Sequence, residues 1–187
     1  MIEKFEIMLK NMDTTYKMFL LKHLIVEVSK GSECFSFFEL ACGIVASAWD
    51  IINIKAKKFT HHDKLFDIFT DIYYKKDGID NYSSFEEVYN YLLDCKHSDI
   101  IKQLNNIVAY APYRLIIDEN ISILIKGIPD KKKNSIIEQY SKNNIDSFYV
   151  ISNKNIKIRK QYVDYIRLNS RMLTKWINSK IDEELGW

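Results

Sequence analysis

Eight lysine and arginine side chains lie between residues 153 and 180, and the only acid among them is Asp164. Ammonium and guanidinium groups bind phosphate oxygens and release the counterions that a polyanion condenses, which gives affinity independent of base sequence. The chemistry that this cluster could do is therefore phosphate binding. A solvated helix face without a partner would explain the same charges equally well. The candidate phosphate ligands in this region are Lys154, Lys157, Arg159, Lys160, Arg167, Arg171 and Lys175.

The charge of the whole chain is asymmetric. Residues 1–125 carry 14 basic and 18 acidic side chains, whereas residues 126–187 carry 13 basic and 7 acidic ones. The formal net charge of +2 thus hides a basic C-terminal third. Such a distribution favours a polyanion, such as a nucleic acid, as the partner of that end.

No pattern in the sequence completes a catalytic or metal site. His61 and His62 are adjacent and cannot face one ion from a helix. Asp94 and Lys96 have the carboxylate-x-lysine spacing of many nucleases, but they stand at the end of a predicted helix. No histidine follows His97, so a hairpin-helix nuclease motif in the basic region would lack its general base. We expect no catalytic residue, no metal and no cofactor in this chain.

The three cysteines form no C-x-x-C pair, which indicates reduced thiols in a cytoplasmic protein. No uncharged run approaches the length of a membrane span, so we expect no membrane partner.

Three classes of function are open for this chain. The first two are nucleic-acid binding and protein binding. The third is an enzyme whose site is assembled from side chains distant in sequence, such as Cys42 or His62 with a carboxylate.

The spacing of the apolar residues predicts that these side chains are positioned mostly by helices. With five glycines and two prolines, the chain favours long regular elements. The strand-like runs 148–151 and 156–158, separated by Ser-Asn-Lys-Asn, predict a β-hairpin near 147–158. The fold expected is α+β and predominantly helical, with six to seven helices, in a single domain (1–187) with a softer boundary at 126–134. The helices are predicted at about 15–30, 36–52, 60–73, 84–96, 98–108, 131–142 and 160–184.

The last predicted helix has the clearest two-sided pattern. At 100° per residue, four of the candidate cations fall in one sector together with Asp164. Tyr149, Tyr162 and Tyr165 could stack on bases, but we interpret them as packing residues. The residues predicted on the inner side of the helix are Tyr162, Tyr165, Asn169, Met172, Leu173 and Trp176.

The segment Tyr110-Ala111-Pro112-Tyr113-Arg114 interrupts the helical pattern. Proline removes a backbone donor and disfavours the helical region for Ala111, so the segment predicts a helix-to-extended junction. The apolar stretch 115–128 is then expected to be strand or buried coil.

Arg114 is a candidate phosphate ligand. The alternative is a half-buried arginine that lies against Tyr110 and Tyr113 and pairs with a helix carboxylate.

Several short segments follow one another in order over residues 14–178. They are Thr14-Thr15-Tyr16-Lys17, Phe38-Glu39-Leu40-Ala41 with Trp49, Asp63-Lys64-Leu65, Tyr110-Ala111-Pro112-Tyr113-Arg114-Leu115, the hairpin 148–158 and Tyr162-x-x-Tyr165-Ile166-x-x-Asn169. In this order the segments resemble the N-terminal region of bacterial HNH endonuclease domain proteins, a group associated with restriction and anti-phage defence. Two departures from that pattern are Asp50 after Trp49, where a proline is often expected, and a glycine-free stretch at 57–62.

The resemblance implies a DNA-directed or complex-forming module and gives this chain no catalytic residues. The HNH motif is not in the sequence, so a nuclease module and its divalent metal are expected only in a partner chain or in a further part of a longer protein. We expect a non-catalytic DNA-binding or nuclease-positioning module. The alternative is a protein–protein interaction or dimerisation module of a defence complex, with a homodimer or a nuclease as partner and no contact with nucleic acid.

Overall fold

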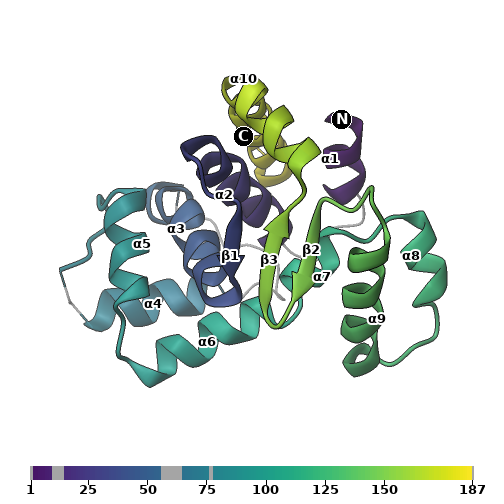
Figure 1. Cartoon of the computed structure of the whole chain (residues 1–187). Helices are drawn as coiled ribbons and strands as arrows, with labels where there is room; N and C mark the ends of the chain where they lie inside the picture. The colour runs from purple at the N-terminus through teal and green to yellow at the C-terminus, as the bar shows by residue number, and fades with distance from the viewer. Residues whose placement is uncertain (1, 10–14, 56–64, 76–77, 187) are drawn as a thin grey trace.

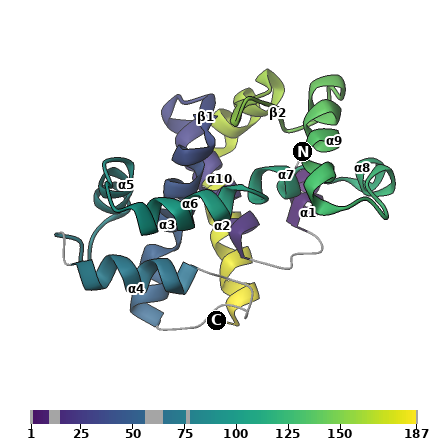
Figure 2. The same cartoon turned by 90° about the horizontal axis from the view of Figure 1, so that it is seen from below.

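Helices pack against one face of a small antiparallel sheet, which faces the viewer in Figure 1 and lies at the upper edge of the molecule in Figure 2. The computed structural model describes residues 2–9, 15–55, 65–75 and 78–186. The expected α+β, predominantly helical class is confirmed. In chain order the elements are α1 (Ile2–Leu9), α2 (Tyr16–Lys30), β1 (Cys34–Ser36), α3 (Phe37–Lys55), α4 (Leu65–Lys75), α5 (Phe85–Leu93), α6 (Ser98–Val108), α7 (Ala111–Leu115), α8 (Glu119–Leu124), α9 (Asp130–Asn143), β2 (Tyr149–Ser152), β3 (Asn155–Ile158) and α10 (Lys160–Leu185).

Local capping residues set several helix ends where the sequence predicts them. Gly31 ends α2 in the left-handed region, at φ 119°. Ser84 and Glu87 form a reciprocal capping box at the start of α5. The same exchange occurs before α3, where the Glu39 carboxylate accepts from the Ser36 amide and the Ser36 hydroxyl accepts from the Glu39 amide. These exchanges satisfy amides that a helix start leaves without partners.

The described residues contain ten helices, more than the six to seven expected. The additional ones include α7 and α8, which replace the strand or coil expected over 115–128. The junction expected at Pro112 is wrong as well, because Ala111 and Pro112 form the first turn of α7. Proline is tolerated there since the amide that it lacks would have no helical acceptor. The break falls instead on Tyr110, at φ −130° and ψ −37°.

The sheet contains the predicted hairpin and one strand that the sequence pattern does not indicate. β2 and β3 pair antiparallel around the turn, and β1 pairs with the other edge of β3 in the order β1-β3-β2. One face of the sheet, with Phe35, Tyr149 and Ile156, is buried. The other face remains open, and it bears Lys157 between Cys34 and Val150.

The main hydrophobic core lies between the sheet and the helices α2, α3 and α10. α10 packs along α2 and is kinked at Asn169, where φ is −118° and ψ is 17°. Of the residues predicted on its inner side, Tyr162 and Leu173 are fully buried, whereas Met172 is 42% exposed, which corrects that prediction. The kink turns the second half of the helix, so a single helical phase cannot describe both halves.

Within the described ranges, no helix is both long and apolar enough to cross a membrane.

Candidate nucleic-acid interface

The candidate cations follow the chain from the hairpin turn onto α10. α10 starts two residues after β3 and runs from the sheet to the opposite edge of the molecule, where the C-terminus lies (Figure 2). A helix rises 1.5 Å per residue, so Lys160 and Lys175 are about 22 Å apart along it, with the kink shortening this slightly. The cations therefore form a long track and not a compact pocket.

Lys154 occupies the hairpin turn, where its backbone is fixed and its side chain is exposed. Asn153 and Lys154 both have positive φ, at 51° and 57°, as a two-residue turn of type I′ requires. The Lys154 carbonyl accepts from the amide of Phe37, at 2.8 Å, which anchors the turn to the start of α3. The Lys154 ammonium is exposed to solvent. The sheet thus presents this charge on a rigid support.

Lys157 projects from the open face of the sheet. Its neighbours in β3, Ile156 and Ile158, are buried on the opposite face, so the strand alternation directs the lysine outward. No ion pair or hydrogen bond joins its ammonium to any described residue. The same holds for Lys154 and for the two cations of the second half of α10, Arg171 and Lys175, which are exposed one turn apart.

Lys160 is also exposed, but it pairs with Asp164 at 2.8 Å one turn further along α10. Both side chains are well exposed, and such a pair contributes well under 1 kcal/mol. A phosphate could therefore replace Asp164 as the partner of Lys160 at small cost. Lys160 belongs with the four unpaired cations as a weaker candidate.

Arg159 and Arg167 have contacts inside the fold that the sequence pattern does not reveal. The Arg159 guanidinium donates to the carbonyls of Ser141 and Lys142, at 2.8 and 3.3 Å, and so caps the last turn of α9. Arg167 donates to the carbonyls of Val28 and Gly31, at 3.3 and 3.0 Å, and so caps the C-terminal end of α2.

Arg167 also forms an ion pair with Glu33, at 3.1 Å. Positive charge at a helix C-terminus is favourable for the helix dipole. The geometry therefore gives both arginines a structural role, although Arg167 remains partly exposed.

Arg114 likewise connects two elements. Its guanidinium lies 3.0 Å from the Asp130 carboxylate at the start of α9 and 5.9 Å from the centre of the Tyr110 ring. Lys133 shares the same carboxylate at 2.8 Å. The two cations hold the pKa of Asp130 below its ordinary value. This arrangement matches the half-buried, paired arginine of the sequence-based alternative, and it ties α7 to α9.

The tyrosines near the track are packing residues. Tyr149 and Tyr162 are fully buried and donate their hydroxyls to the carbonyls of Pro112 and Asp146. Neither ring presents a face for a base, as we expect from the sequence, and Tyr165 is half-buried. Along the described part of the track the surface is therefore charged, and Tyr149 and Tyr162 offer no stacking platform on it.

Two of the chemistries considered from the sequence, a metal site and a cysteine thiolate, have no support among the described residues. These residues contain no cluster of three or more histidine, cysteine or acidic side chains that could hold a metal ion. Burial raises the pKa of the Cys42 thiol to about 12, so Cys42 is not a thiolate nucleophile at neutral pH. Burial also lowers the pKa of His23 to about 3. His62, the other residue of the distant-enzyme hypothesis, lies outside the described ranges.

Comparison of the chain with protein-family models, with curated proteins and with solved structures finds no significant match.

Proposed function

We propose that this chain is a non-catalytic, cytoplasmic DNA-binding module that contacts the phosphate backbone through the hairpin and α10. The observation that carries the proposal is the set of four exposed cations, Lys154, Lys157, Arg171 and Lys175, that have no partner among the described residues. An unpaired cation on a rigid element can bind a phosphate without first breaking an internal contact. The ordered motifs that resemble HNH endonuclease proteins support placing the module in a bacterial restriction or defence system.

Three of the candidate cations are poorly suited to a DNA-binding test. Arg114, Arg159 and Arg167 already bind an internal carboxylate or carbonyl groups. Substitution of any of these arginines would remove an internal contact as well as a surface charge. A binding test that removes Arg167, for example, would confound loss of phosphate contact with loss of the α2 cap.

The test is fluorescence anisotropy with a labelled short DNA duplex of random sequence, over a range of salt concentrations. The variant K154A/K157A/R171A/K175A should bind more weakly, and its slope of log K against log salt should be smaller in magnitude by about 3 to 4, or about 0.9 per lost phosphate contact.

The control variant K30A/K96A/K102A/K142A removes the same charge from exposed lysines elsewhere and should retain the wild-type slope. Unchanged affinity of the first variant at low salt would contradict the proposal. Equal losses in the two variants would contradict it too, since affinity would then depend on net charge alone.

A further inference from the structure

The two ends of the molecule carry opposite charge. Helices α4 and α5 lie at one end and α8 and α9 at the other, in both views (Figures 1 and 2). The described residues of the first end, 65–75 and 78–94, include six acidic side chains and one basic side chain. Residues 119–143, which span the second end, include five basic and three acidic ones. Neither end belongs to the hairpin–α10 track.

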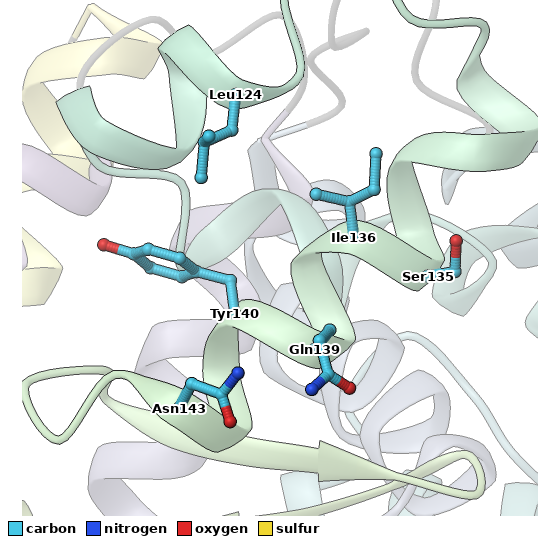
Figure 3. Close-up of a pocket in the computed structure, with 6 residues that line it drawn as sticks. All are labelled: Leu124, Ser135, Ile136, Gln139, Tyr140 and Asn143. Atoms are coloured by element: carbon cyan, nitrogen blue, oxygen red, sulfur yellow. The ribbon is translucent and has the colours of Figure 1, made fainter.

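An apolar groove opens between α8 and α9 at the basic end (Figure 3). Its volume is about 380 Å³. Leu124 of α8 faces Ile136 and the Tyr140 ring of α9 across the opening (Figure 3). Ile123 and Leu124 are 74% and 55% exposed, although isoleucine and leucine are among the residues most often buried. Ser135, Gln139 and Asn143 form a polar wall along α9.

One carboxylate fixes two sides of the groove relative to each other. The Asp118 carboxylate accepts from the Ile121 amide, at 2.9 Å, and thereby caps α8. The same carboxylate accepts from the Tyr140 hydroxyl, at 2.9 Å, which fixes the ring that lines the groove. One side chain thus joins the start of α8 to the middle of α9. A preformed site loses less entropy when it is filled.

Two free cations flank the groove. Lys132 is one helical turn before Ile136 on the same face of α9, and Lys126 follows Leu124 by two residues. Both are exposed, and neither forms an ion pair with a described residue. Their neighbour Lys133 is bound to Asp130, and Lys142 to Glu138. The occupant that fits is therefore an apolar or aromatic surface with acidic residues beside it.

The opposite end of this chain presents such a surface. Tyr74 and Tyr82 are 74% and 91% exposed, and the ring of Tyr73 stands edge-on to Tyr74, 6.0 Å away. Asp67 lies two turns before Tyr74 on the same face of α4. It is exposed and pairs with no described residue. Tyrosine is enriched at protein interfaces because its ring is apolar and its hydroxyl is polar.

We propose that copies of this chain associate head to tail, with the α4–α5 end of one copy in the α8–α9 groove of the next. The charges disfavour the symmetric alternatives, since groove against groove would bring lysines together and two α4–α5 ends would bring carboxylates together. A head-to-tail contact uses two different surfaces. Each of the two copies in such a contact therefore keeps one unused surface, to which a further copy can bind. This inference is independent of the proposed DNA binding.

The first test is light scattering of the whole chain over a range of concentrations. The average mass of the wild type should rise from 22.2 kDa through its multiples. Variants I123S/L124S and Y74S/Y82S should both remain monomers. The matched control is L168S, which removes an 86% exposed leucine from α10 and should associate like the wild type. A wild type that stays monomeric at every concentration would overturn the proposal.

The second test mixes the two blocked variants. Each retains one intact surface, so the mixture should form one-to-one pairs of twice the monomer mass and nothing larger. A groove-to-groove dimer would instead form with Y74S/Y82S alone, and a dimer through the acidic ends with I123S/L124S alone. Either result would refute the head-to-tail contact. All the substituted side chains are more than half exposed, so the melting temperatures should match that of the wild type.

Discussion

The imidazole ring of His23 lies directly over the α-carbon of Gly43, so that α2 and α3 meet at a histidine and a glycine. A Cβ atom at Gly43 would stand 2.4 Å from three atoms of the ring. The ring is fully buried, and neither of its nitrogens has a hydrogen-bond partner within the described part of the chain. The rings of Phe35, Phe85 and Tyr89 have centres 5.5 to 6.0 Å away. The site is a tightly packed, apolar setting for a titratable group.

The contact predicts that G43A destabilises the protein. Alanine is favoured over glycine in a helix by about 1 kcal/mol, but the clash with His23 should outweigh this and give a net loss of about 1 to 3 kcal/mol in the free energy of unfolding. Urea denaturation measures it. In the H23A background the clash is gone, so the same substitution should be neutral or stabilising. A loss of equal size in both backgrounds would show that the ring is not the cause.

His23 also predicts a pH dependence of stability. Burial, together with the nearby Lys30, lowers its pKa from 6.5 to about 3, so below pH 6.5 the unfolded chain binds the proton more readily than the folded one. The contribution of the neutral ring to stability is therefore present above pH 6.5 and is lost as the pH falls toward 3. The slope should approach about 1.4 kcal/mol per pH unit below about pH 6.

The control for this effect is H23F, which keeps an aromatic ring in the site and removes the titration. Its unfolding free energy, measured by urea denaturation between about pH 7 and 5, should depend on pH less steeply than that of the wild type. Restricting the comparison to this range avoids most of the titration of carboxylates. Parallel pH profiles of the two proteins would contradict the assignment.

Local signals in the sequence predict several helix ends and turns of this fold. They do not predict which elements contact one another. The Ser84–Glu87 box, Gly31 and the Ser-Asn-Lys-Asn turn act within a few residues, and the structure confirms each of them. β1 has three residues and exists through its pairing with β3, more than 100 residues away in sequence. Nothing in such a short segment distinguishes it from a loop.

The candidate interface shows the same limit. Arg167 and Arg171 have the same side chain and lie one turn apart, so a helical projection places both on the outer face. The acceptors of Arg167 are backbone carbonyls 136 and 139 residues away, and every residue type has a carbonyl. The sequence therefore cannot separate a structural arginine from a free one. The exposed cations are predictable as a group, and their individual roles are not.

Arg167 and Arg171 provide a matched test of the structural role that the contacts give to Arg167. R167Q should lower the free energy of unfolding by about 1 to 3 kcal/mol, because it weakens the cap of α2 and the contact with Glu33. R171Q, one turn away, should change it by less than about 0.5 kcal/mol. Chemical denaturation of the two variants in parallel gives both values. If R171Q proved as damaging as R167Q, net charge and not the α2 cap would explain the loss.

Tyr149 and Tyr162 offer a second matched pair, one that separates a buried hydrogen bond from one near the surface. Both hydroxyls donate to a backbone carbonyl, that of Pro112 in the buried site and that of Asp146, at 2.7 Å, in the other. Burial holds the pKa of the Tyr149 phenol well above 10, so the group is a neutral donor throughout the accessible pH range.

Y149F leaves the Pro112 carbonyl without a donor in the interior and should cost about 1 to 3 kcal/mol of unfolding free energy. Y162F should cost less, because Asp146 is an exposed residue and this hydrogen bond is only partly buried. Urea denaturation monitored by the near-UV signal of the aromatic core measures both. Since Tyr149 joins β2 to α7, hydrogen exchange of the α7 amides should accelerate in Y149F and not in Y162F. Equal effects of the two variants on stability and exchange would show that burial of the hydroxyl is not what matters.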